Sequence, residues 1–177
     1  TTAGGTITSW EISPDPGSAF HFNSFNGVIS GTPGILLTRT QYTIYANNSG
    51  GSAFASVNVT INDNIPILSY SPENLTLYNN TMSSDLPLAP TLTGSGTITL
   101  WEINGSLPTG LNFGTSNGTI WGIPEVLELT AVTYTIWANN SGGSSLASIN
   151  ITINDNIPIL SYSPENLTLY NNTMSSD

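Results

Sequence analysis

The stretch Tyr134–Asp155, YTIWANNSGGSSLASINITIND, decides the fold. In its second half, Ala147, Ile149, Ile151 and Ile153 occupy every second position and alternate with serine, asparagine and threonine. A period of two places the apolar side chains on one face of a β-strand. The first half alternates in the same way, and the Asn-Ser-Gly-Gly sequence between the halves is typical of a hairpin turn because glycine tolerates positive φ. The stretch therefore predicts two antiparallel strands that bury one face.

The chain carries this pattern twice. The sequence at Gln41–Asn58, QYTIYANNSGGSAFASVN, matches Thr133–Asn150 at an offset of 92 residues. The 26 residues of Thr60–Asp85 recur unchanged at Thr152–Asp177, at the same offset. Self-similarity at a fixed period indicates a tandem array in which each repeat is one structural unit.

The phase of the repeat suggests three segments. Residues 1–63 form a repeat body that lacks its opening strands, residues 64–155 form a complete repeat, and residues 156–177 form the opening segment of a further repeat. Two interpretations follow. Either the chain is an excerpt of a longer array, or the segment 156–177 is a donor that completes the body 1–63 of a neighbouring molecule by strand addition.

Short strands separated by turn signals indicate an all-β fold. A second hairpin is expected at Asn117-Gly118, joining Leu111–Phe113 to Thr119–Trp121, and no segment shows the 3.6-residue period of an amphipathic helix. Strands of this kind in units of about 90 residues are typical of antiparallel β-sandwiches. We expect the sandwiches to be joined end to end into a rod.

The composition excludes several classes of function. The 177 residues include 68 asparagine, serine and threonine residues, 11 carboxylates and one cationic side chain, Arg39, for a formal net charge of −10. Binding of nucleic acid or of an anionic membrane surface needs clustered lysine or arginine, so we expect neither. Without cysteine, the chain has no disulfide, thiolate zinc site or cysteine nucleophile. No apolar run approaches the ~18 residues of a membrane span.

The candidates for catalysis are few. His21 is the only histidine, and the residue aligned with it in the second copy is Asn112. A repeated catalytic unit would need its base twice, and no G-x-S-x-G turn presents a serine nucleophile. We therefore expect no catalytic residues and no enzymatic activity.

The recurring Asn-Asp-Asn-Ile-Pro sequence lies between the last strand of one repeat and the first strand of the next. Its proline stiffens the joint, and its carboxylate and amide oxygens are ligands that calcium prefers. Two interpretations remain: an Asx turn that caps a bend, or a calcium site. The candidate calcium ligands are Asp63, Asn64, Asp155, Asn156, Glu11 and Glu102.

Glycosylation sequons are the most frequent chemical signal in the sequence. The pattern N-x-S/T marks exposed acceptors in secreted proteins, although asparagine and threonine also coat polar sheet faces. The predicted glycosylation sites are Asn47, Asn58, Asn74, Asn79, Asn104, Asn117, Asn139, Asn150, Asn166 and Asn171.

Aromatic residues fall on both faces of the predicted strands. By alternation, Tyr45 and Trp137 lie on the outward face, where a sugar could stack on them or where they could pack against a cross-strand neighbour. Trp101, which aligns with Trp10, is expected in the core.

Together these motifs resemble a known family. LPTGLNF and NGTIWGIP within Leu107–Pro124, followed by Tyr134–Asp155, are similar to the Ig-like repeat of the He_PIG type in large bacterial and archaeal surface proteins, including Asn-rich, lysine-free repeats of marine archaea. The first copy departs at Pro14–Phe22, PDPGSAFHF. The Asn-Asp-Asn-x-Pro junction resembles that of cadherins, where calcium stiffens the linkers. The resemblance implies an Ig-like or cadherin-like module at the cell surface.

We therefore expect a non-enzymatic structural repeat of an extracellular filament, stalk or adhesin, glycosylated and assembled head to tail. Its partners would be adjoining repeats of the same chain or copies of itself. The alternative is a carbohydrate-binding or adhesive module that uses Tyr45 and Trp137 to bind surface glycans.

Overall fold

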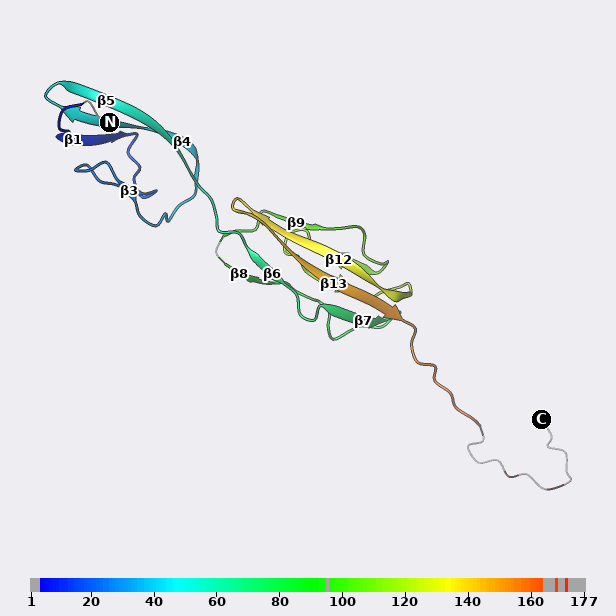
Figure 1. Cartoon of the computed structure of the whole chain (residues 1–177). Helices are drawn as coiled ribbons and strands as arrows, with labels where there is room; N and C mark the ends of the chain where they lie inside the picture. Colours follow the sequence, from blue (N-terminus) through cyan, green and yellow to red (C-terminus); the bar gives the residue numbers. More distant parts are fainter. Residues whose placement is uncertain (1–3, 95, 164–167, 169–170, 172–177) are drawn as a thin grey trace.

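The computed structural model describes residues 4–94, 96–163, 168 and 171 (Figure 1). Within this part of the chain there are thirteen β-strands and no helix. Figure 1 shows strands β1–β5 and strands β6–β13 as two groups that follow each other along an elongated molecule. The all-β fold class is thereby confirmed.

The first group contains one three-stranded sheet and one short hairpin. The sheet has the order β1-β4-β5 and is antiparallel throughout, and β2 pairs with β3. The strands are β1 (Ser9–Ser13), β2 (His21–Phe22), β3 (Ile29–Ser30), β4 (Leu37–Asn48) and β5 (Gly51–Ile61).

The second group is a complete sandwich of two layers. A four-stranded sheet with the order β7-β13-β12-β9 forms one layer, and the pairs β6-β8 and β10-β11 form the other. A bridge between Leu88 and Ile120 connects the segment before β8 to β11. The strands are β6 (Ile67–Ser69), β7 (Asn74–Tyr78), β8 (Thr91–Thr93), β9 (Leu100–Ile103), β10 (Leu111–Phe113), β11 (Ile120–Gly122), β12 (Glu128–Asn140) and β13 (Gly143–Asn154).

Both predicted hairpins are confirmed. The β12–β13 turn closes with Asn140 opposite Gly143, and β10 and β11 pair with Phe113 opposite Ile120. The alternation along β13 also has the expected result, because Ile149, Ile151 and Ile153 are buried while the residues between them are not.

One strand pair differs from the expected antiparallel pattern. Strand β7 runs parallel to β13, with Asn74 opposite Asn150 and Tyr78 opposite Asn154. The backbone N–H of Asn150 donates to the carbonyl of Glu73 at 2.8 Å, and that of Asn79 donates to Asn154 at 2.9 Å. Strand β7 of the opening segment therefore forms one edge of the sheet that contains the last strand, β13.

The core of the second group lies between its two layers. It includes Trp101, as the sequence predicts, together with leucine, isoleucine and tyrosine side chains from both layers. The Trp101 ring covers Gly118, whose φ of 70° is in the left-handed region and where an added Cβ would meet the ring. The buried cluster consists of Leu68, Tyr70, Leu75, Leu77, Leu88, Trp101, Leu111, Ile120, Tyr134, Ile136, Ala138, Ile149, Ile151 and Ile153.

Candidate interaction surfaces

The inner face of the β1-β4-β5 sheet is covered less than its counterpart in the second group. Strand β5 pairs only with β4 among the described residues. Counterparts of fully buried core residues are half-buried in this sheet: Trp10, Ile44, Ala46, Val57, Val59 and Ile61. In the second group, β6, β7 and β8 supply this cover. We call this half-buried inner face of β4 and β5 the open face.

A shallow groove of about 300 Å³ lies on the open face, and its lining includes Trp10, Gly27, Ile44 and Ala53. Gly27 is the counterpart of Gly118, and it lies under the Trp10 ring as Gly118 lies under Trp101. The groove therefore corresponds to a position that the second group fills with its own opening segment.

Tyr70 fills that position in the second group. Its phenol donates a hydrogen bond of 2.6 Å to the backbone carbonyl of Gly118 and is only 3% exposed. Burial raises the pKa of the Tyr70 phenol well above its usual value, because the anion would lose its hydration. Burial also raises the pKa of Tyr134, and the carboxylate of Glu128 adds to this increase.

The segment after β13 exposes the same residues that β6 buries. Leu68 and Tyr70 are 6% and 3% exposed, whereas their sequence counterparts Leu160 and Tyr162 are 77% and 75% exposed. Ile159 lies beside them and is also exposed. Contiguous exposed apolar side chains of this kind mark interaction sites or aggregation hazards in soluble proteins.

The junction between the two strand groups is held by the β12–β13 turn. The Ser141 hydroxyl donates to the carboxylate of Asp63 at 2.8 Å and accepts the Asp63 backbone N–H at 2.9 Å. The Asn140 amide donates to the carbonyl of Asn64 at 2.8 Å. Gly142 approaches the backbone so closely that an added Cβ would collide with the Asp63 carbonyl.

The Asn-Asp-Asn-Ile-Pro strand junction is recognisable in the sequence, but its hydrogen-bond partners are not. Ser141 and Asn140 are separated from Asp63 and Asn64 by more than 75 positions, so no local pattern connects them. The recurrence of Asn-Ser-Gly-Gly in both copies is the available signal, and by itself it predicts only a turn.

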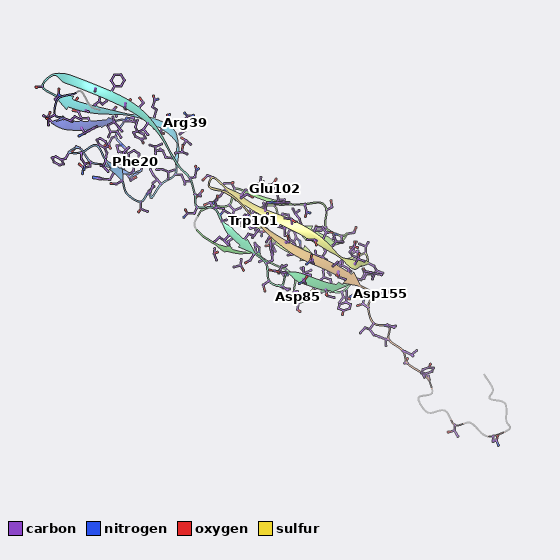
Figure 2. The ribbon with its side chains drawn as sticks, viewed as in Figure 1. Phe20, Arg39, Asp85, Trp101, Glu102 and Asp155 are labelled. Carbon is purple, nitrogen blue, oxygen red and sulfur yellow. The ribbon has the colours of Figure 1, made fainter. Side chains whose placement is uncertain are left out.

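The candidate calcium ligands lie in separate places. The carboxylates of Glu11 and Glu102 accept hydrogen bonds from Asn47 and Asn139 on their own sheets. Figure 2 shows Glu102 near the junction end of the second group and Asp155 at the opposite end.

Asp155 and Asn156 form hydrogen bonds at the end of β13. Asp155 accepts the N–H of Asn156 at 2.8 Å, and the Asn156 amide donates to the carbonyl of Asn79 at 2.8 Å. In the described part of the chain, no three His, Cys, Asp or Glu residues are grouped as metal ligands would be. The calcium site stays a prediction.

The predicted glycosylation sites differ in how their amides are used. The side-chain amide of Asn150 donates to Asn74 at 2.8 Å, and those of Asn47 and Asn139 donate to Glu11 and Glu102. Five further predicted sites are exposed: Asn58, Asn74, Asn104, Asn117 and Asn171. Asn79 is half-buried, its side-chain oxygen has no partner among the described residues, and Asn166 lies outside them.

The outward aromatic residues are half-buried. Tyr45 packs against Phe54 across the hairpin, with ring centroids 6.2 Å apart. Trp137 lies opposite Leu146 and borders a groove of about 270 Å³ that Glu102 and Asn139 also line. His21 is exposed on β2, opposite Ser30.

The family model He_PIG, described as "Putative Ig domain", matches residues 65–154, which is the β6–β13 sandwich. The chain belongs to this family. Ig-like domains are typical of adhesion proteins and structural repeats, are generally non-enzymatic and are commonly extracellular.

Several solved structures are similar to this He_PIG chain. Mouse cadherin-23 EC22-24 is 12% identical, with 83% of this chain and 52% of that chain covered and a TM-score of 0.39. Human protocadherin-24 EC1-2 is 13% identical, with 84% and 82% covered and a TM-score of 0.42. The chain thus spans about half the length of the cadherin-23 structure. No curated protein matches the sequence, and the described residues include no helix with the length and hydrophobicity needed to cross a bilayer.

Proposed function

We propose that this He_PIG chain is a non-enzymatic structural repeat of an extracellular filament, stalk or adhesin at the cell surface, glycosylated and joined head to tail to further repeats. The observation that carries the proposal is the parallel pairing of β7 with β13. Strand β7 lies in the opening segment of the second group and β13 is its last strand, so both lie close to the points where tension along the chain enters the group.

Parallel pairing determines how such tension acts. The two ends of the chain pull β7 and β13 in opposite directions along their length, so the ladder bonds from Asn74 to Tyr78 are sheared together. An antiparallel terminal pair whose pulled ends were adjacent would instead open one bond at a time. Leu75 and Leu77 of β7 are also fully buried, so sliding the strand exposes apolar surface. The geometry suits a repeat that transmits tension.

The junction supports joining in series. Asp63 and Asn64 are bound by the β12–β13 turn through Ser141 and Asn140. The same Asn-Asp-Asn-Ile-Pro sequence returns at residues 154–158, at the end where a following repeat would begin. If the same turn geometry recurred at every junction, each pair of neighbouring repeats would have the same relative orientation.

The sequons support an extracellular location. A surface rich in asparagine, serine and threonine with few charges gains solubility when glycans are attached. Exposed acceptors such as Asn58 and Asn117 are accessible to the glycosylation machinery.

Single-molecule pulling tests the proposed mechanical role. The chain has no cysteine, so pairs of introduced cysteines define the pulling points uniquely. Pulling between Asn62→Cys and Asp155→Cys loads β7 and β13 in shear. Pulling between Met82→Cys and Asp155→Cys loads their adjacent ends. We expect a clearly higher rupture force for the first pair, and equal forces would contradict the proposal.

The alternative function, binding of surface glycans, is favoured by the groove beside Trp137, where an aromatic edge meets Glu102 and Asn139. It predicts saturable glycan binding that Trp137→Ala abolishes while the fold is kept. A glycan array on wild type and variant measures this, and an array without signal would remove the alternative.

A further inference from the structure

A mainly apolar groove of about 580 Å³ lies on the surface of the second group. Two parts of the chain line it. The segment before β8 contributes Met82 and Leu86, and the end of β11 contributes Trp121 and, one residue after the strand, Ile123. The groove is within the size range of sites that hold small ligands, which is roughly 300–1,000 Å³.

Strand alternation turns the Trp121 ring away from the core. Ile120, which precedes it on β11, is fully buried and bridges to Leu88. Trp121 is 42% exposed, and Met82 and Ile123 beside the same groove are also exposed. Exposed apolar side chains that lie together mark interaction sites in soluble proteins. Packing of the core therefore does not explain why a tryptophan is at this position.

A predicted glycosylation site borders the groove. Asn117-Gly118-Thr119 is a sequon, and Asn117 and Thr119 both line the groove. The Asn117 side-chain oxygen accepts the backbone N–H of Thr119 at 3.1 Å, whereas its amide nitrogen donates to no residue in the part of the chain that the structure describes. An added Cβ at Gly114 would meet both the Asn117 side-chain oxygen and the Trp121 ring. A sugar attached to the Asn117 nitrogen would therefore begin beside the tryptophan.

The first group lacks both the sequon and the aromatic side chain at the corresponding hairpin. Its sequence NGVISGTP, residues 26–33, aligns with NGTIWGIP, residues 117–124. Three of the groove residues differ between the copies: Thr119, Trp121 and Ile123 are replaced by Val28, Ser30 and Thr32. Because Val28 removes the sequon, Asn26 is not a glycosylation acceptor.

The hairpin forms in both copies despite these differences. Strand β2 pairs with β3 as β10 pairs with β11. The Asn26 side chain accepts the N–H of Val28 at 3.1 Å, in the same way as Asn117 accepts that of Thr119. The hairpin therefore needs neither the acceptor threonine nor the tryptophan, and the two occur together in one copy. Their joint presence favours a sugar on Asn117 as the occupant of the groove.

We propose that the innermost sugar of an N-linked glycan on Asn117 packs on the Trp121 ring and fills the groove beside Met82 and Leu86. A pyranose has an apolar face of C–H groups that can stack on an indole. In the transfer step, the Asn117 nitrogen loses a proton and bonds to the anomeric carbon, and the lipid-linked phosphate that carried the glycan leaves. The inference rests on the glycosylation in the proposed function and deepens it, because here the glycan becomes part of the packed structure.

The packed sugar has a consequence for stability. It would contact β11 on one side of the groove and the segment before β8 on the other. Unfolding of the second group would separate these two parts and return the Trp121 ring to water, which costs free energy in proportion to the apolar area exposed. A glycan on Asn117 should therefore stabilise the second group, whereas a glycan on an open surface should not.

NMR of the glycosylated chain locates the sugar. The chain is produced with ¹³C-labelled sugars in a host that performs N-glycosylation, and mass spectrometry of glycopeptides gives the occupancy of each sequon. Protons of the first sugar on Asn117 should show upfield ring-current shifts and NOEs to Trp121. The first sugar on Asn58, an exposed site on β5, is the internal control and should show neither. Trp121→Ser, which introduces the residue of the first copy, should abolish the shifts at Asn117.

Urea denaturation measures the effect of the sugar on stability. Thr119→Val removes the sequon but keeps Asn117 and the backbone N–H that its side chain accepts; Thr119→Ser keeps the sequon and is the matched control. Thr119→Val should raise the unfolding equilibrium constant of the second group roughly fivefold more in glycosylated chain than in chain from a host without glycosylation, as loss of one aromatic contact does. Thr119→Ser should show no such difference between the hosts, and in a Trp121→Ser background the difference for Thr119→Val should disappear.

The possible results separate this inference from the proposed function. Glycans on other sequons with Asn117 unmodified, sugar shifts that Trp121→Ser leaves unchanged, or an equal effect of Thr119→Val in both backgrounds would overturn the inference and leave glycosylation in place. A chain without glycans at any sequon would contradict the glycosylation as well. Concentration-dependent association of the unglycosylated chain that Trp121→Ser abolishes would also overturn the inference, because the groove would then hold a second copy.

Discussion

Strands β5 and β13 occupy the same place in two copies of one repeat, yet they bury their apolar residues to different depths. Ile149, Ile151 and Ile153 of β13 are fully buried, whereas Val57, Val59 and Ile61 of β5 are half-buried. The difference arises from their neighbours, because β13 has β7 at its edge and β6 over its face, and β5 has neither among the described residues. The opening segment, rather than the hairpin, closes the core.

The largest expected effect comes from deleting one core side chain in each copy. Ile136→Ala removes a fully buried side chain from β12 and should reduce the free energy of unfolding of the second group by about 2–5 kcal/mol. Ile44→Ala, at the half-buried counterpart, should cost about half as much, since less apolar surface is lost. Urea denaturation followed by resolved NMR signals of β4 and β12 measures both. Equal losses of unfolding free energy in the two variants would contradict the claim that β4 and β12 bury their apolar residues to different depths.

The same comparison shows which features the sequence could predict. Local alternation identified the β12–β13 hairpin and its inward residues, since burial of every second side chain follows from strand geometry alone. The position of β7 could not be derived in this way. Its parallel pairing joins residues 76 positions apart, and short alternating segments such as Asn74–Tyr78 are compatible with several neighbours and directions.

The candidate site, too, could be predicted from the sequence only in part. The junction sequence was recognisable because it recurs and contains proline, but its Ser141 and Asn140 partners depend on how the second group is placed after folding. The open face was partly predictable, because strand alternation places Val57, Val59 and Ile61 on one face of their strand. Which side chains are only half-buried required the structure.

The second prediction concerns the turn, which contacts the junction in only one copy. Gly142→Ala places a methyl group against the Asp63 carbonyl and should destabilise the junction by about 1–3 kcal/mol, as overpacking does. Gly50→Ala, at the counterpart, meets only the Asn48 side chain and should have little effect. NMR relaxation measures whether the two strand groups tumble together. If Gly142→Ala leaves their common tumbling unchanged, the turn does not hold the junction.

A third and smaller effect distinguishes the two copies of the tyrosine. Tyr70→Phe removes the hydrogen bond to the Gly118 carbonyl and should cost about 1 kcal/mol at neutral pH. The control, Tyr162→Phe, should leave the unfolding of the second group unchanged because Tyr162 is exposed there. Urea midpoints of both variants provide the measurement, and an equal shift for both would show that the Gly118 bond contributes nothing.

Tyr70 also makes stability depend on pH. Burial raises the pKa of its phenol above the value of about 10 for an unfolded chain, so the folded state holds the proton more tightly. The contribution is complete below pH ~10 and is lost as the pH rises through the folded-state pKa. Stability should therefore fall above pH ~10, with a shallower fall in Tyr70→Phe. Identical slopes in the two proteins would contradict this assignment.

The smallest effect concerns glycosylation. The Asn150 amide donates to Asn74, whereas its counterpart Asn58 is exposed and makes no side-chain hydrogen bond among the described residues. In a glycosylating host, we expect higher occupancy at Asn58 than at Asn150, measured by mass spectrometry of glycopeptides. Asn58→Gln should change the free energy of unfolding by less than about 0.5 kcal/mol. Equal occupancy would show that the Asn150–Asn74 bond does not protect its amide.

The most direct test of the central claim compares two backbone amides in one molecule. The Asn150 N–H donates to Glu73 of the opening segment, whereas its counterpart Asn58 lies in β5, which pairs only with β4 in the part of the chain that the structure describes. Hydrogen exchange in dilute, monomeric protein should be slow at Asn150 and fast at Asn58. Adding a synthetic peptide of residues 156–173 should slow exchange at Asn58 alone. An Asn58 amide as protected as Asn150 in the monomer, or one that the peptide leaves unchanged, would contradict the claim that the opening segment closes each repeat.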